Sequence, residues 1–266
     1  PRRAGASGDA DVMAEARVLR DKARHLRDNI GFIARGLQSR VDYAVGTGVV
    51  RKWGGRHAER LDALWRAWVR QADADGVRSL DALEAAAVHA MDVDGGVLLR
   101  LRARLPEDGL AVPLQLQLIE VDWIDETRTQ PSRPGNVVIN GYEYDMLGRW
   151  VGAWLWDQHP GSGGVGGQPV SMQSRLVPAS VLIPLDNVTR PGQRRGLSRL
   201  APLINTVRDL HLLKDAELAR RNLESRIGVI ASGDPQALDG GIKANGSPVS
   251  LGDLPSGGVL QLPGGL

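Results

Sequence analysis

The stretch from Thr189 to Ile230 reads TRPGQRRGLSRLAPLINTVRDLHLLKDAELARRNLESRIGVI, and it predicts one long helix. Ser198 is a favourable N-cap, and Pro202 is tolerated in the first turn because only one intrahelical hydrogen bond is lost there. Gly228 is a natural stop, since glycine readily takes the left-handed conformation that ends many helices. The predicted helix holds roughly thirty residues, against a mean of about 11–12 in globular proteins.

The apolar residues of this stretch recur at the three- and four-residue spacing of one helix face. Glu217 and Arg221 add a favourable pair four residues apart. A helix of this length needs neighbours along its whole length, which a small monomer rarely supplies, so the stretch predicts self-assembly. The predicted apolar face comprises Leu200, Leu203, Ile204, Val207, Leu210, Leu213, Ala216, Leu223 and Ile227.

The composition is that of a folded protein. The chain has 266 residues, of which 42% are apolar, so it is long enough to bury a sizeable core. It contains no cysteine, which excludes disulfides and thiolate metal sites. No apolar run approaches the ~18 residues of a membrane span, and no apolar core follows the N-terminal arginines. We therefore expect neither a membrane segment nor a signal peptide.

Charge is distributed unevenly along the chain, although the net charge is only +2. Residues 73–126 hold 12 acidic and 4 basic side chains, a net charge of −8. Residues 190–226 hold 9 basic and 4 acidic side chains, a net charge of +5. Separate acidic and basic zones suit self-assembly, or a polyanion passing one surface.

The remaining periodicities predict an α+β fold: N-terminal helices, a β-rich middle, the long helix, and an end of loops and short strands. Helices are expected over residues 11–45 with a break near Asn29, 57–72 and 79–91. Strands are expected over residues 97–105, 113–121, 137–156 (a hairpin turning at 145–148), 181–185, 247–251 and 257–263. We divide the chain into a helix-and-strand region (1–135), a hairpin-rich region (136–188), the long helix (189–230) and a loop-rich end (231–266).

Three short motifs have two interpretations each. Gly46-Thr47-Gly48 could cradle phosphate, but it closes a helix and lacks the Gly-Lys-Ser/Thr ending of a P-loop, so a helix stop is favoured. Asp73–Gly76 resembles part of a calcium loop, but the first and twelfth loop positions would be Gln71 and Ala82, which supply no carboxylate, so it is a turn. Trp65 and Trp68 could form a ligand platform, but their helical spacing favours core packing.

Charged side chains on the predicted sheet raise the question of an enzyme. Three arginines on one strand face could grip phosphates, although a solvated face paired with nearby acids is favoured. Carboxylates at the end of the next strand could bind Mg²⁺ or act as acid and base. The arginines are Arg100, Arg102 and Arg104, and the acids are Glu120, Asp122 and Asp125.

No further catalytic or ligand set accompanies these acids. The five histidines are all more than five residues apart, and neither a Walker motif nor a Gly-x-Ser-x-Gly elbow occurs. We therefore expect no catalytic residue, no metal and no cofactor. A nucleic-acid-processing or phosphate-handling enzyme that uses Gly46–Gly48, the acids and the arginines remains the alternative.

Several motifs together resemble lambda-type tailed-phage portal proteins. Residues 190–221, with RPGQRRGLSRLAP and KDAELARR, match the pattern closely. Weaker matches are VGTG at 45–48, LQLIEVD at 116–122 and the segment from Gly141 to His159-Pro160. The family usually has a histidine where this chain has Ile183-Pro184. This departure weakens any role borrowed from the family for that position.

The resemblance implies a non-enzymatic subunit of the portal ring, a dodecamer at one capsid vertex through which DNA is packaged and ejected. Its partners would be other copies of itself, double-stranded DNA bound without sequence preference, the large terminase subunit, a head-completion or adaptor protein, and the capsid protein. It implies a virion location after assembly in the host cytoplasm, with no membrane. By the same resemblance, residues before about 185 are wing and clip material, the long helix is a stem helix, and the chain lacks the distal C-terminal helices of the family.

Basic residues on or near the long helix are the candidates for a DNA channel. Glu217 and Glu224 would neutralise them in part, which predicts a weakly attractive lining along which DNA can slide. The candidates are Arg195, Arg199, Lys214, Arg220 and Arg221.

Overall fold

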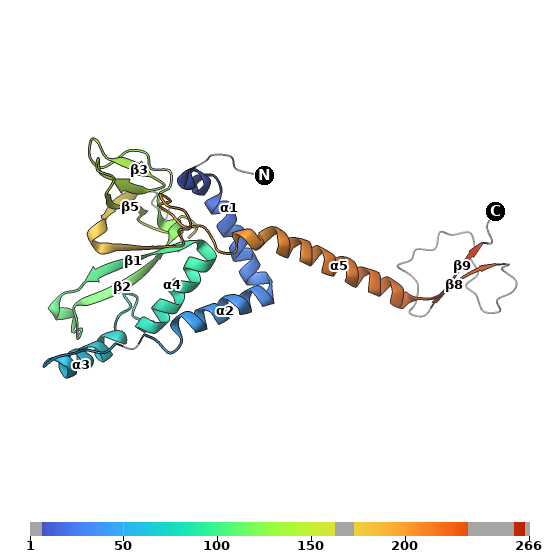
Figure 1. Cartoon of the computed structure of the whole chain (residues 1–266), viewed down its shortest axis with the longest axis horizontal. Coiled ribbons are helices and arrows are strands. Elements are labelled where there is room, and N and C mark those ends of the chain that lie inside the picture. Colours follow the sequence, from blue (N-terminus) through green and yellow to red (C-terminus); the bar gives the residue numbers. More distant parts are fainter. Residues whose placement is uncertain (1–6, 50, 163–172, 234–257, 264–266) are drawn as a thin grey trace. The chain divides into compact units, whose positions relative to one another are not determined.

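The computed structural model describes residues 7–49, 51–162, 173–233 and 258–263 (Figure 1). The chain forms two compact units, residues 1–204 and residues 205–266. The first unit contains helices and two antiparallel sheets, and the second contains the long helix and one strand pair. The predicted α+β class is therefore confirmed. None of the described helices is long and apolar enough to cross a membrane.

The helices of the first unit begin and end where local sequence signals lie. Ser7 accepts a hydrogen bond from Ala10 N and caps the first helix, and Ile30 takes an extended conformation that separates it from the second. Gly46 ends the second helix with φ 56°, so the predicted helix stop is confirmed. The four helices are α1 (Gly8–Asn29), α2 (Gly31–Val45), α3 (Ala58–Val69) and α4 (Leu80–Asp94).

The strands of the first unit form two sheets, in the orders β2-β1-β7 and β3-β4-β5-β6. The hairpin that turns at Asp145–Gly148 is confirmed as β4 and β5, and a second turn at Asn140-Gly141 adds β3 in front of it. Asn140 has φ 52°, a left-handed conformation that asparagine tolerates. The strands are β1 (Gly96–Ala103), β2 (Leu114–Glu120), β3 (Val137–Ile139), β4 (Tyr142–Tyr144), β5 (Trp150–Trp156), β6 (Ser174–Pro178) and β7 (Leu182–Asp186).

Two apolar clusters hold these elements together. The larger brings Leu98 and Ile119 of the first sheet against Tyr142 and Leu155 of the second. The smaller packs α3 and α4 against β2, and Trp65 and Trp68 lie half-buried against it. Trp68 donates its indole N–H to Leu114 O at 2.6 Å. The two tryptophans are therefore packing residues, as predicted.

The structure also decides between the two interpretations of the Asp73–Gly76 motif and of the arginine face of β1. Asp73 accepts hydrogen bonds from the N–H groups of Asp75, Val77 and Arg78, so this motif is a turn. The arginine face of β1 differs from the prediction. Arg104 donates hydrogen bonds to two neutral acceptors, Gln115 Oε1 and Ala74 O. Arg100 and Arg102, on the same face, make no ion pair with a described residue. Pairing with nearby acids was therefore the wrong expectation.

The second unit contains the long helix α5 (Ile204–Arg226), β8 (Ile227–Gly233) and β9 (Gly258–Pro263). The helix has 23 residues and starts later than predicted, because a 3₁₀ turn with Pro202 in it, Ala201–Leu203, precedes it. The strand predicted at 257–263 is confirmed as β9, which pairs with β8 in parallel. The strand predicted at 247–251 lies outside the described residues.

Several leucines of α5 are exposed, so the predicted apolar face has no continuous cover within the described structure. Glu217 and Glu224 both pair with Arg220, at 3.8 and 2.7 Å, and this replaces the predicted pair of Glu217 with Arg221. The exposed leucines are Leu210, Leu212, Leu213, Leu218 and Leu223.

Candidate functional site

The segment that leads into the long helix, residues 189–200, is held against the rest of the first unit by hydrogen bonds of its backbone. We call it the connecting segment. Arg199 N donates to Asp92 O at 2.9 Å, and Ser198 Oγ donates to the same oxygen at 3.2 Å. Gly196 N donates to Asp186 Oδ1 at 3.2 Å. Ser198 Oγ also accepts a hydrogen bond from Leu200 N, so its side chain joins α4 to the connecting segment. It does not cap an α-helix, because α5 begins only at Ile204.

Two glycines allow the connecting segment to approach α4 this closely. A Cβ on Gly196 would collide with Gly95 O and would lie 2.5 Å from Asn187 N. A Cβ on Gly95 would lie 2.7 Å from the carbonyl carbon of Leu197, and Gly95 has φ 88°. All these neighbours are backbone atoms, which cannot rotate away. The requirement for glycine at the last position of the RPGQRRG motif, Gly196, is therefore steric.

The glutamine of the same motif organises the turn before Gly196. Gln193 is 8% exposed, and its Oε1 accepts hydrogen bonds from the N–H groups of Thr189 and Arg190, both at 3.2 Å. Its Nε2 donates to Arg195 O at 2.7 Å. One buried amide thus satisfies three backbone groups of the turn, which explains the glutamine without any ligand.

Two predicted channel arginines hold the connecting segment in place. Arg195 is 3% exposed, pairs with Glu126 at 2.9 Å and donates to Asn140 O at 3.2 Å. Arg199 pairs with Asp92 at 2.8 Å and is half-exposed. Within the protomer, therefore, the charge of Arg195 faces inward and that of Arg199 is shared with a buried carboxylate.

Replacement of Gly196 by alanine tests this close approach. We expect Gly196→Ala to lower the free energy of unfolding by about 3 kcal/mol, because overpacking against fixed backbone costs roughly 1–3 kcal/mol or more. Gly36→Ala is the matched control: a Cβ there meets nothing within 4 Å. Since alanine is a better helix former, the control should gain about 1 kcal/mol. Urea unfolding followed by circular dichroism measures both, and equal effects would contradict the steric explanation.

The predicted acid cluster is a structural ion-pair network. Asp122 pairs with Arg20 at 3.0 Å and with Arg24 at 2.6 Å, and Arg24 also pairs with Asp94 at 2.7 Å. Burial disfavours the Asp122 carboxylate, but the two arginines outweigh it and hold its pKa below the ordinary value of 3.8. Asp125 is buried elsewhere and accepts from Thr127 and Ser174. The network fastens α1 to the end of β2.

Asp122 should therefore make stability depend on pH. Its folded pKa is below its unfolded value, so its contribution is complete above about pH 4 and declines as the pH falls further. We expect Asp122→Asn to cost about 3 kcal/mol at pH 7, since it removes the nearest carboxylate from the buried Arg20 and one of two from the half-buried Arg24, and less at pH 3. Asp62→Asn, which removes an exposed pair with Arg66, is the control and should cost under about 1 kcal/mol. Urea unfolding at both pH values measures the difference, and a cost that does not depend on pH would refute the linkage.

His159 joins these acids in space, which the sequence did not reveal. Its Nε2 lies 3.4 Å from Glu120 Oε2, and ligand atoms of Glu120, Asp122 and His159 all fall within 4.8 Å of one another. The residues do not fit a metal, however. Asp122 is already held by two arginines, and His159 Nδ1 accepts from Gly161 N at 3.0 Å. The proton of a neutral His159 is therefore on Nε2, the nitrogen that a metal here would need.

The other three predicted channel residues lie on α5 and are exposed. Arg220 is partly neutralised by Glu217 and Glu224. Lys214 and Arg221 make no ion pair with any residue in the described part of the chain. These two retain the full charge available to a partner.

Among the described residues, several buried charges of the first unit are paired within the protomer, whereas the long helix exposes leucines and two cations that make no ion pair. The family model described as phage portal protein, lambda family, matches residues 2–265, nearly the whole chain, so the chain belongs to the lambda family of phage portal proteins. It is a family of structural, non-enzymatic proteins of the phage head. No curated protein matches the chain.

Proposed function

We propose that the chain assembles with copies of itself into the portal ring, through which DNA is packaged into the capsid and later ejected. The family match over residues 2–265 carries this proposal. The exposed leucines of α5 support it, because a helix with apolar residues in water needs a partner and a neighbouring copy of the same helix supplies one. A ring of identical subunits requires heterologous contacts that close by rotation.

The proposed ring is a dodecamer at one capsid vertex, assembled in the host cytoplasm. Its proposed partners are the large terminase subunit during packaging, a head-completion or adaptor protein afterwards, and the surrounding capsid protein. We assign the long helix to the stem beside the channel, and the regions 1–135 and 136–188 to the wing and clip. The protein contributes geometry and electrostatics, with no bond chemistry of its own.

We place Lys214, Arg220 and Arg221 in the channel lining. We no longer propose Arg195 as a channel residue, because its guanidinium is 3% exposed and paired with Glu126. Arg199 keeps a half-exposed charge, but Asp92 shares it. Since Glu217 and Glu224 neutralise Arg220 in part, each subunit would offer DNA only a few cations, which permits sliding.

Ring formation by the full natural protein is the direct test of assembly. Mass photometry at micromolar concentration should show closed rings, and Leu210→Ser with Leu213→Ser should shift the population to smaller species without unfolding the protomer, because both leucines are exposed. Met146→Ser with Leu147→Ser is the matched control: these residues are also exposed, but lie on the β4–β5 turn. Monomers alone, or equal effects of the two double variants, would contradict the role of α5.

The salt dependence of DNA binding tests the channel lining. Each phosphate neutralised on duplex DNA contributes about −0.9 to the slope of log K against log salt. We expect Lys214→Gln with Arg221→Gln to make the slope of the assembled ring shallower, by roughly one to two phosphates per subunit that contacts DNA. Lys22→Gln, on the exposed side of α1, should leave the slope unchanged. An unchanged slope in the α5 variant, or sequence-specific binding, would remove these residues from the channel.

A further inference from the structure

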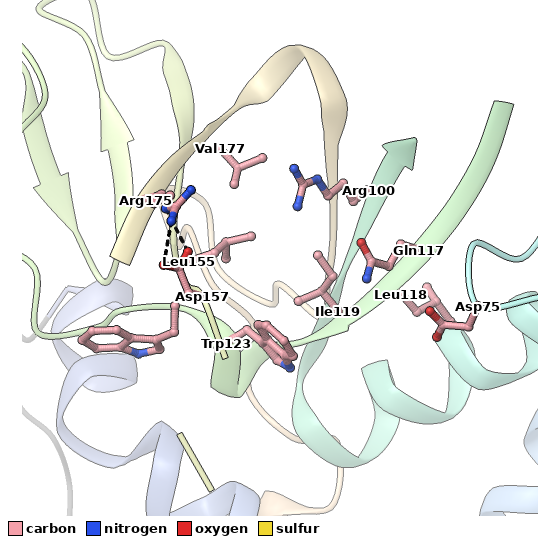
Figure 2. Close-up of a pocket in the computed structure, with 11 residues that line it drawn as sticks. Asp75, Arg100, Gln117, Leu118, Ile119, Trp123, Leu155, Asp157, Arg175 and Val177 are labelled. Atoms are coloured by element: carbon pink, nitrogen blue, oxygen red, sulfur yellow. Dashed lines mark hydrogen bonds and ion pairs between the residues drawn. The ribbon is translucent and has the colours of Figure 1, made fainter. Parts of the chain in front are cut away.

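A cleft within the first unit is lined by an arginine, Arg100, that makes no ion pair with any described residue. The cleft has a volume of about 420 Å³ and is lined by β1 and β2 of the first sheet and by β5 and β6 of the second (Figure 2). Arg100 of β1 and Gln117 of β2 are direct cross-strand partners, so their side chains share one sheet face. Both line the cleft.

Neither of these two side chains is satisfied within the described structure. Arg100 makes no hydrogen bond or ion pair with a described residue, and the dashed lines in Figure 2 join only Arg175 and Asp157. Burial and the neighbouring Arg102 lower the pKa of Arg100. Gln117 Oε1 is buried and has no hydrogen-bond partner among the described residues.

The rest of the lining offers Arg100 no compensation. Arg175 and Asp157 neutralise each other at 3.0 Å, and Asp75 is exposed. Apolar side chains lie between these polar groups, among them Ile119 and Leu155, which are both buried. The cleft therefore presents an unpaired cation, a buried acceptor and an apolar wall within one space.

We propose that this cleft binds an extended acidic segment of another protein chain. A carboxylate of the segment pairs with Arg100, a backbone N–H donates to Gln117 Oε1, and an apolar side chain rests on the wall. Such a segment satisfies both unmet groups at once, and a cleft of this volume suits a few side chains. A DNA duplex is a stiff rod and does not fit into it. The site lies within the first unit and requires neither the ring nor the DNA path.

The test uses a fluorescein-labelled, C-terminally amidated peptide, Leu-Glu-Leu-Asp-Leu, and its neutral counterpart Leu-Gln-Leu-Asn-Leu, in anisotropy titrations with the 266-residue chain. We expect Arg100→Gln to weaken binding of the acidic peptide by about ten- to a hundredfold, the range for loss of a charge-assisted hydrogen bond. Arg100→Lys should weaken it less, because lysine keeps the charge but loses the planar fork. Arg102→Gln is the matched control, since Arg102 lies on the same face but does not line the cleft, and it should change binding less than about threefold.

The neutral peptide should bind more weakly to the wild-type chain and be insensitive to Arg100→Gln, which is the signature of a direct pair in a double-mutant cycle. Circular dichroism confirms that each variant is folded. Absence of binding, or equal losses in Arg100→Gln and Arg102→Gln, would overturn the proposal. Displacement of the peptide by a 20-base-pair duplex with the same dependence on Arg100 would assign the site to nucleic acid and would also overturn it.

Discussion

The close contact between the backbones of Gly95 and Gly196 is the constraint on which the first unit depends. Any side chain on Gly196 would meet the carbonyl oxygen of Gly95, and any on Gly95 would meet the backbone of Leu197. At this distance the end of α4, the end of β7 and the connecting segment share hydrogen bonds through Asp92, Asp186 and Asn187. Backbone hydrogen bonds therefore fix the conformation of the connecting segment that precedes α5.

Charge is arranged to serve the same purpose. The acidic zone of the sequence suggested attraction between subunits, but much of it is neutralised within the protomer by arginines of α1, α2 and the connecting segment. Asp122 forms ion pairs with Arg20 and Arg24, Asp92 with Arg40 and Arg199, and Glu126 with Arg195. Ion pairs with one buried member hold geometry more than they add stability, because desolvation of the buried charge offsets the attraction. A portal subunit needs such a defined geometry, since its contacts must repeat around a closed ring.

Local features of the fold were predictable because their causes are local. The break near Asn29, the helix stop at Gly46 and the turn at Asp145–Gly148 each follow from backbone preferences of a few neighbouring residues. The tryptophans of α3 were assigned to packing from their helical spacing, and they do pack. The resemblance in RPGQRRGLSRLAP pointed to the family that nearly the whole chain matches.

The sequence by itself determined the α+β class, the order of its elements, the long helix and the family, because periodicity, turn residues and motifs are properties of contiguous residues. The tertiary structure decided which charges remain available. Local sequence does not distinguish Arg195 from Arg100, yet Arg195 is buried and paired with Glu126, whereas Arg100 lines a cleft and makes no ion pair with a described residue. His159 reaches Glu120 across 39 residues of chain. The charge available on an arginine depends on the carboxylates that lie within a few ångströms of it, and those come from segments that only folding brings together.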